Sequence, residues 1–402
     1  MTHVVVIGAG QAGAALVAKL RATGHAGEIT LIGEETAPPY QRPPLSKAYL
    51  MGEMAEERLW LRNQEYYAEQ RITLRLGQPV TAIDPKARKV TVGGDTIAYD
   101  ELALTTGSHP RRLPAAIGGD LAGVYAVRTL ADVDAMKAEF VAGRRLVIVG
   151  GGYIGLEAAA VASKLGLDVT VLEMAPRILQ RVAAPETSGY FRALHAAHGV
   201  KILEETGLER LLGDGRVTGV RLADGTELPA DFVIAGVGIL PGTALAEAAG
   251  LAIENGIKTD EFGRTSDPHI WSAGDCASFP WQGGRLRLES VGNAIDQAEA
   301  VAENILGLGK PYQAKPWFWS DQYDCKLQIA GLNTGYDSVV TRGPEGDAVS
   351  FWYFKGDTLL AVDAMNDPRA YMVGKRLIEN GKSPSKAALA DPATVMKDLL
   401  KA

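Results

Sequence analysis

Two short glycine-rich stretches have the residue types and spacing that bind the phosphates of a dinucleotide. Residues 8–13 read GAGQAG, and residues 150–155 read GGGYIG. In a G-x-G-x-x-G turn the first glycine permits a tight turn, the second lets a pyrophosphate approach, and the third lets a helix pack against a strand. The N–H groups and the dipole at the start of that helix attract phosphate. One dinucleotide needs one such turn, so the sequence predicts two dinucleotide sites.

An acidic residue follows each turn at the distance expected for a ribose ligand. Glu34 lies 21 residues after Gly13, and Glu173 lies 18 residues after Gly155. A carboxylate at such a strand end accepts hydrogen bonds from ribose hydroxyls and repels a 2′-phosphate. Arg177 is the first cation after Glu173, four residues later. The second site therefore favours NADH over NADPH, and we expect the first to hold a flavin permanently.

The elements that position these turns recur in the two halves of the chain. The apolar runs predict strands at 4–7, 28–33, 145–149 and 168–172, and a helix at 156–165. Hairpins are expected at 88–105 and 217–228, the second followed by a buried strand within 231–242. The repeated order of strand, helix, strand and hairpin indicates duplication of a Rossmann-like unit.

Two loops carry polar residues on the side of the sheet where cofactors bind. Residues 37–50 contain four prolines, and a helix is expected near Ser46. Arg42 and Lys47 in this loop could meet phosphate or flavin, or form an ordinary exposed basic pair. Asp275 follows the apolar run 270–273, where it could bind a flavin's ribityl hydroxyl or simply stabilise a turn. A helix is expected at 293–306.

The pattern changes from Trp317 onward, where short alternating strands are joined by Gly or Asp turns. This predicts an antiparallel α+β domain. The expected fold is thus α/β, with two Rossmann-like dinucleotide-binding domains, for FAD and NAD, plus a C-terminal α+β domain. The expected limits are 1–110 with 243–318 for the FAD domain, 111–242 for the NAD domain and 319–402 for the C-terminal domain.

Composition excludes several other classes of protein. The 402 residues have a net charge of −7, which gives no general attraction for nucleic acid. No apolar run reaches the ~18 residues of a membrane span, so we expect a cytoplasmic protein. The two cysteines, Cys276 and Cys325, are 49 positions apart. This spacing disfavours a disulfide framework or a structural metal site.

Taken together, the motifs identify a resemblance to a known family. The segments VVVIGAGQAG, RPPLSKAYL, TTGSHPRRLP, VIVGGGYIGLE, TSDPHIWSAGDC, ESVGNAIDQA and WFWSDQY span nearly the whole chain. The sequence resembles the ferredoxin reductases of bacterial oxygenase systems, of the putidaredoxin reductase type, within the glutathione-reductase-like flavoproteins. One departure is Thr105, which stands where this family usually has alanine.

The resemblance implies a residue set for each cofactor. FAD would contact Gly8, Gly10, Gln11, Ala12, Gly13, Glu34, Arg42, Lys47, Val80, Thr106, Gly107, Arg128, Gly274, Asp275, Val291 and Trp319. NADH would contact Gly150, Gly152, Tyr153, Ile154, Gly155, Glu173 and Gly238. Lys47 and Glu157 resemble the family's charged pair beside the hydride-accepting nitrogen and are the expected catalytic residues. Glu157 is expected in the first turn of its helix, where the dipole alone favours a carboxylate.

The electron acceptor follows from the absence of a cysteine pair near the first helix. Without it, electrons must leave one at a time for an external carrier. The resemblance points to a small ferredoxin of the two-iron type that supplies a cytochrome monooxygenase or a dioxygenase. Its docking surface could include Arg62, Arg111 and Arg112. The sequence leaves the oligomeric state open.

Other functions remain open at this point. The chain could be an NADH-dependent flavin oxidase or quinone reductase, or a rubredoxin reductase. A flavoprotein that acts through redox-sensitive interactions is a further alternative, of a different class.

Overall fold

The chain of the computed structural model, described over residues 2–343 and 348–401, divides into two units. The first comprises Met1–Arg42, Ala55–His109 and Ile239–Pro316. The second comprises Pro43–Met54, Pro110–Gly238 and Trp317–Ala402. The chain therefore crosses between the units several times, and the lysine of the proline-rich loop belongs to the second unit. The three-domain limits expected from the sequence stay a prediction.

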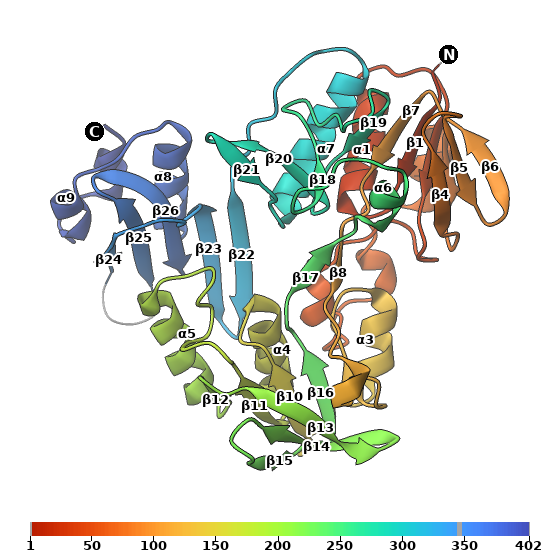
Figure 1. Cartoon of the computed structure of the whole chain (residues 1–402). Helices are drawn as coiled ribbons and strands as arrows, with labels where there is room; N and C mark the ends of the chain where they lie inside the picture. Colours follow the sequence, from red (N-terminus) through yellow and green to blue (C-terminus); the bar gives the residue numbers. More distant parts are fainter. Residues whose placement is uncertain (1, 344–347, 402) are drawn as a thin grey trace. The chain divides into compact units, whose positions relative to one another are not determined.

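A parallel sheet forms the centre of the first unit (Figure 1). Its order is β19 (Ile270–Ser272), β7 (Glu101–Leu104), β1 (Val4–Ile7), β2 (Ile29–Ile32) and β3 (Ile72–Arg75). Helices α1 (Gln11–Ala22) and α7 (Val291–Ile305) cover one face, where Val4, Leu16 and Val301 pack together. The antiparallel strands β4 (Val80–Asp84), β5 (Lys89–Val92) and β6 (Asp95–Ala98) cover the other. Strands buried on both faces explain the continuous apolar runs.

The second unit repeats this plan with a second parallel sheet. Its order is β12 (Lys201–Leu203), β11 (Asp168–Leu172), β10 (Arg145–Val149), β16 (Phe232–Ala235) and β9 (Val124–Tyr125). Helix α4 (Tyr153–Lys164) follows β10. Strands β13 (Leu208–Asp214), β14 (Arg216–Leu222) and β15 (Glu227–Pro229) pack on one face through Val217 and Val220. The duplication expected from the sequence is therefore present, although the hairpins differ from the prediction. The first, expected at 88–105, is β5 and β6 paired with β4, and its last part is β7 of the parallel sheet; the second, expected at 217–228, belongs to the three-stranded sheet β13–β15.

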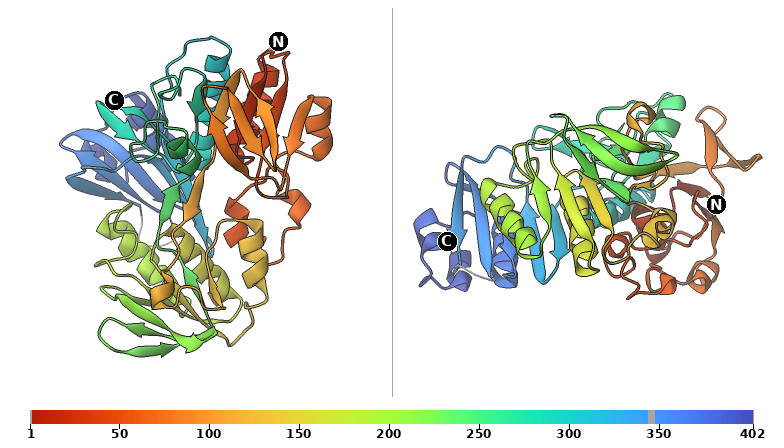
Figure 2. Two further views of the ribbon diagram at one scale, coloured as in Figure 1. Left: turned by 45° about the vertical axis from the view of Figure 1, so that its right-hand side comes forward. Right: turned by 90° about the horizontal axis from the view of Figure 1, so that it is seen from below.

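The C-terminal part is an antiparallel sheet, as expected, and it belongs to the second unit (Figure 2, blue). Its order is β22 (Trp317–Gln322), β23 (Cys325–Gly331), β26 (Thr358–Met365), β25 (Val349–Lys355) and β24 (Ser338–Arg342). Helix α8 (Pro368–Glu379) covers one face, where Trp352 meets Leu377. Helix α5 (Pro185–Ala197) packs on the other through Phe191 and Tyr353. Both faces are thus buried, and the predicted fold class is confirmed.

The remaining elements are short. They are the helices α2 (Gln64–Glu69), α3 (Leu130–Lys137), α6 (Ala244–Ala248) and α9 (Lys386–Ala390), the strands β8 (Ser108–Pro110), β17 (Ile239–Pro241), β18 (Ile257–Lys258), β20 (Ala277–Trp281) and β21 (Gly284–Leu286), and the 3-10 turns η1 (Pro43–Ser46), η2 (Glu56–Arg58), η3 (Ala115–Ile117) and η4 (Met396–Lys401). Within the described residues, none of the helices combines the length and apolar character needed to cross a membrane.

Two helix predictions need correction. The helix expected from residue 156 begins at Tyr153, directly after the glycine turn, so Glu157 lies in its second turn and not its first. The helix expected near Ser46 is only the 3-10 turn η1. Lys47 N and Tyr49 N both donate to Pro44 O, so the chain continues in turns instead of a regular α-helical pattern. Glu157 therefore owes its place to something other than the helix dipole, which acts mainly over the first turn.

Candidate functional site

The first glycine turn is shaped by three different steric demands. Gly8 has a φ of 110°, and a Cβ there would lie 2.1 Å from Thr105 O. A Cβ on Gly13 would lie 2.0 Å from Gly8 O, whereas one on Gly10 would meet no described atom within 4 Å. Gly10 also caps α1 without a side-chain hydrogen bond, and the first turn carries no acid. The backbone N–H groups of Gln11, Ala12 and Gly13 thus border open space that suits a pyrophosphate.

The second glycine turn is constrained at the same three positions, by similar backbone contacts. Gly150 has a φ of 109°, and its Cβ would lie 2.3 Å from Gly236 O. A Cβ on Gly155 would lie 2.3 Å from Gly150 O, and Gly152 again has no described atom within 4 Å. Gly152 caps α4 without a side-chain hydrogen bond. This turn therefore fits a second pyrophosphate, with the N–H groups of Tyr153 and Ile154 behind Gly152.

The two predicted ribose acids differ in how firmly they are held. Glu34 is exposed just after β2. Glu173 is half-buried, and its carboxylate accepts hydrogen bonds from Gly151 N at 2.8 Å and Ala175 N at 2.7 Å. The acid is thus held against the second glycine turn. Arg177 instead donates to Ser188 Oγ at 2.6 Å, so this cation already has an anchor.

Lys47 and Glu157 form an ion pair within the second unit, in which the carboxyl is buried and the lysine is partly buried. Lys47 Nζ lies 3.0 Å from Glu157 Oε1, and Glu157 is 6% exposed. Ser320 Oγ donates to Glu157 Oε1 at 2.7 Å, and Ser46 Oγ donates to Oε2 at 2.9 Å. Burial raises the pKa of Glu157, while Lys47 and the two serines oppose that shift. Hydrogen bonds from a cation and two hydroxyls can hold this buried carboxyl in its ionised form.

Other predicted FAD residues of the first unit gather near its glycine turn. Ser108 Oγ donates to Asp275 Oδ2 at 2.9 Å, beside Gly274 in a left-handed conformation. Gly107 O accepts from Gly242 N at 2.8 Å, which fixes the segment after Thr106. Arg42 is paired with Glu35 at 2.6 Å. Val80 begins β4 and Val291 begins α7.

Three predicted FAD residues, Lys47, Arg128 and Trp319, belong to the second unit, so their contact with FAD stays a prediction. Trp319 lies on β22 and stacks on Trp317 with ring centroids 5.5 Å apart. Gly238, predicted for NADH, has a φ of 97° and accepts from Arg111 N at 2.8 Å. Tyr153 packs its ring against Phe318, with centroids 5.1 Å apart.

Three further side chains that act on these residues were not predicted from the sequence. Ser46 and Ser320 lie in motifs that were recognised, but only their neighbours Lys47 and Trp319 were singled out. Thr105 was noted only as a departure from the family pattern. Its hydroxyl donates to Gly8 O at 2.8 Å, which ties β7 to the glycine turn in a way alanine cannot.

The two cysteines do not form a redox pair. Both are free and buried, one in each unit. Burial raises the pKa of the Cys325 thiol to about 11, so that thiol stays protonated at neutral pH.

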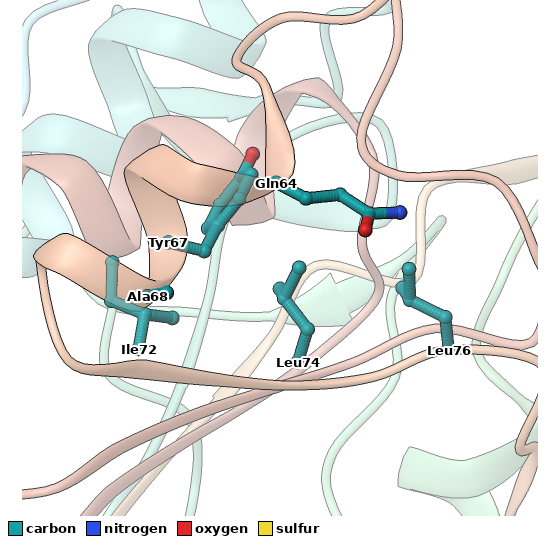
Figure 3. A pocket seen from close by; sticks show the side chains of 6 residues that line it. All are labelled: Gln64, Tyr67, Ala68, Ile72, Leu74 and Leu76. Atoms are coloured by element: carbon teal, nitrogen blue, oxygen red, sulfur yellow. The ribbon is translucent and has the colours of Figure 1, made fainter.

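A separate open groove lies between α2 and β3 in the first unit (Figure 3). Its volume is about 360 Å³, and it is lined by Gln64, Tyr67, Ala68, Ile72, Leu74 and Leu76. None of the predicted site residues lines it, so it is not part of the dinucleotide sites.

Comparison with known proteins agrees with this geometry. Residues 2–298 match the pyridine nucleotide-disulphide oxidoreductase family, and residues 317–400 match the reductase C-terminal family. The chain is 42% identical to the putidaredoxin reductase of Pseudomonas putida, over 100% of this chain and 97% of that protein. It is 40% identical to the ferredoxin–NAD(+) reductase component of the anthranilate 1,2-dioxygenase system of Burkholderia cepacia, over 98% of each chain. The crystal structure of a covalent putidaredoxin reductase–putidaredoxin complex matches with a TM-score of 0.96 and 42% identity, over 100% of this chain and 98% of that one.

Proposed function

Because the chain belongs to the pyridine nucleotide-disulphide oxidoreductase family, we propose that it is an FAD-containing NADH:ferredoxin reductase. It takes a hydride from NADH and passes single electrons to a small ferredoxin that supplies an oxygenase. The observation that carries this proposal is the pair of glycine turns with the same steric constraints. Each turn precedes a helix whose N-terminus has no side-chain hydrogen bond to its cap. The chain also has no cysteine pair near the first helix.

Family membership implies FAD and a pyridine nucleotide as cofactors. FAD would lie on the turn Gly8–Gly13, with Glu34 at its ribose and Asp275 at its ribityl chain. NADH would lie on the turn Gly150–Gly155, with Glu173 at its ribose. Bound flavin supplies the chemistry, because it accepts a hydride and releases electrons singly. The protein residues bind, orient and balance charge.

Lys47 and Glu157 have complementary roles in this proposal. We place the pair beside the hydride-accepting nitrogen on the strength of the family resemblance. The Lys47 ammonium would supply positive charge that stabilises a reduced, negatively charged flavin held beside it. Glu157 balances that ammonium beforehand and is itself kept ionised by Ser46 and Ser320. The net charge of Lys47 and Glu157 can therefore change while the fold stays the same.

Two features support NADH over NADPH. The Glu173 carboxylate is anchored to Gly151 N and Ala175 N, where it would repel a 2′-phosphate. Arg177, the first cation that follows, is engaged with Ser188. A 2′-phosphate would therefore meet a fixed negative charge before any available positive one.

The proposed acceptor is a two-iron ferredoxin. One relative is named as a putidaredoxin reductase, and one matching structure is its covalent complex with putidaredoxin. Buried, separate thiols offer no internal disulfide to accept the electrons. Arg62, Arg111 and Arg112 are exposed, and they remain the proposed contacts for an acidic partner. The cytoplasmic location also stays a prediction.

Steady-state and stopped-flow assays with the purified holoprotein test this function. NADH should reduce the bound flavin rapidly, and a two-iron ferredoxin should then sustain turnover. Parallel reactions contain rubredoxin, a quinone or oxygen alone, and NADPH replaces NADH in a matched series. Rapid flavin reduction with turnover on oxygen or quinone but on no ferredoxin would reject the proposal in favour of an oxidase or quinone reductase. Turnover on rubredoxin alone would identify a rubredoxin reductase.

A further inference from the structure

A chain of side-chain hydrogen bonds leads away from Glu157 through the interior of the second unit. Ser320 Oγ lies 2.7 Å from Glu157 Oε1, and Gln322 Nε2 lies 3.1 Å from Ser320 Oγ. Gln322 Oε1 lies 2.8 Å from His195 Nε2, and Tyr323 Oη lies 3.2 Å from His195 Nδ1. Ser320, Gln322 and His195 are each 0% exposed. This series of hydrogen bonds thus joins the ion pair of Lys47 and Glu157 to helix α5, and water has little access to the side chains between them.

The chemistry of the two ends decides which atom donates in each hydrogen bond of this series. An ionised carboxylate can only accept, so Ser320 must donate its one proton to Glu157. Ser320 then accepts from the Gln322 amide, which turns the Gln322 carbonyl toward His195. His195 must carry its proton on Nε2 to donate to that carbonyl, and Nδ1 accepts from Tyr323. Every donor therefore points toward Glu157.

Burial keeps His195 in the neutral form that this arrangement needs. It lowers the pKa of His195 to about 4, with a smaller opposing effect from the hydrogen bond to Gln322. A neutral imidazole has one donor nitrogen and one acceptor nitrogen, so its tautomer can follow the direction of the chain. Lys47 lies beside Glu157, and Asp321 lies 4.0 Å from Lys47 Nζ. His198 and Tyr323 are the titratable groups beside His195.

The far end of the chain is held in a strained conformation. Tyr323 lies in the two-residue connection between β22 and β23 and has a φ of 56°. That region suits glycine or asparagine, and a bulky residue there is strained. Its ring stacks on His198 with centroids 3.6 Å apart, and its hydroxyl bonds His195. These contacts offset the strain and hold the last group of the chain in place.

We propose that Ser320, Gln322 and His195 are positioning residues that couple the charge of Glu157 to the tautomer of His195. With Glu157 ionised, His195 carries its proton on Nε2. With Glu157 protonated on Oε1, the carboxyl O–H donates a hydrogen bond to Ser320, and Ser320 donates to the carbonyl of the rotated Gln322 amide. The Gln322 N–H then donates to His195 Nε2, so His195 takes the tautomer with its proton on Nδ1. No bond to carbon changes, and the two states differ by one proton in total, the one on Glu157. A catalytic role for Glu157 rests on the proposed function, but the coupling does not.

Nitrogen-15 NMR of the histidine-labelled holoprotein, without NADH, tests the coupling. The His195 signals are assigned by their loss in His195→Gln. In the unsubstituted protein the ring should be the Nε2–H tautomer. Ser320→Ala breaks the chain and should produce a mixture of tautomers. Ser46→Ala is the matched control, measured at a high pH at which Lys47 and Ser320 keep Glu157 ionised. It removes a serine from the other oxygen of the same carboxylate, outside the path to His195, and at that pH it should leave the tautomer unchanged.

Lys47→Met provides a second test should Ser320→Ala fail to fold. Loss of the ammonium favours protonated Glu157, so the Nδ1–H tautomer should appear at a higher pH than in the unsubstituted protein. Wild-type histidine signals in Ser320→Ala, equal changes in Ser46→Ala, or no pH-dependent tautomer change in Lys47→Met would each overturn the proposal. Since no acceptor protein is present, these results do not depend on whether the ferredoxin assignment holds.

Discussion

Substitution of Gly152 by alanine should separate nucleotide binding from folding. The φ and ψ of Gly152 are −82° and 175°, an extended conformation that alanine adopts without strain. Its Cβ would meet no described atom within 4 Å. At such a position Gly→Ala leaves stability unchanged or raises it by about 0.4–1 kcal/mol. The new methyl group would, however, occupy the space in which the pyrophosphate of NADH should lie.

The size of the binding defect follows from the lost contacts. A hydrogen bond to a charged group contributes about 1.5–3 kcal/mol. Loss of one such bond to the pyrophosphate weakens binding by about tenfold to a hundredfold or more. Gly155→Ala should behave differently, because its Cβ would lie 2.3 Å from Gly150 O. Overpacking of this kind costs about 1–3 kcal/mol of stability.

Calorimetry on the FAD-loaded protein measures both quantities, as the Kd of NAD⁺ and the Tm. Gly189→Ala is the control, because Gly189 lies inside helix α5 with no described atom within 4 Å of its Cβ. There alanine should stabilise the helix by up to about 1 kcal/mol and leave the Kd unchanged. A folded Gly152→Ala protein with the parental Kd would refute the assignment of this turn to the pyrophosphate. A Gly155→Ala protein as stable as Gly189→Ala would refute the steric argument.

Three further predictions follow from the same structure. Glu173→Arg combined with Met174→Arg should raise the NADPH:NADH ratio of kcat/KM at least about tenfold, which corresponds to ~1.4 kcal/mol. An unchanged ratio would show that Glu173 does not contact the ribose of the nucleotide. Lys47→Met should slow flavin reduction in stopped-flow by about tenfold to a hundredfold while the Kd for NAD⁺ changes little; an unaltered rate would remove Lys47 from the catalytic pair. Burial raises the pKa of Asp363 to about 6, above the ~4 of an unfolded aspartate. The contribution of Asp363 to the free energy of unfolding is therefore complete below pH ~4 and is lost as the pH rises through 6. Asp363→Asn should remove on the order of 3 kcal/mol of this pH dependence from the free energy of unfolding in urea, and identical pH dependence in both proteins would contradict the assignment.

The glycine turns and the fold class could be predicted from the sequence, because their causes are local. A tight turn between an apolar strand and a helix needs glycines at set offsets, whatever the rest of the chain does. The positions of Glu34 and Glu173 follow from the same βαβ geometry. The change to alternating strands after Trp317 likewise reports burial on a pleated sheet.

Contacts between distant segments could not be predicted in this way. Ser320 is 163 residues from Glu157, and Ser46 is 111 residues from it. Neither residue shows a periodic pattern, because serine suits a turn or an exposed strand equally well. Only the packing of β22, α4 and the turn at Pro43–Ser46 turns both hydroxyls toward one carboxylate. Likewise, the hydroxyl of Thr105 acquires a role only because β7 pairs with β1 beside Gly8.

The amino-acid sequence alone therefore determined where the two glycine turns lie, since each depends on backbone sterics within about 25 residues. The tertiary structure alone decided which groups surround the buried carboxyl of Glu157. Burial and hydrogen bonding compete there, and their balance depends on groups that only the folded chain brings together.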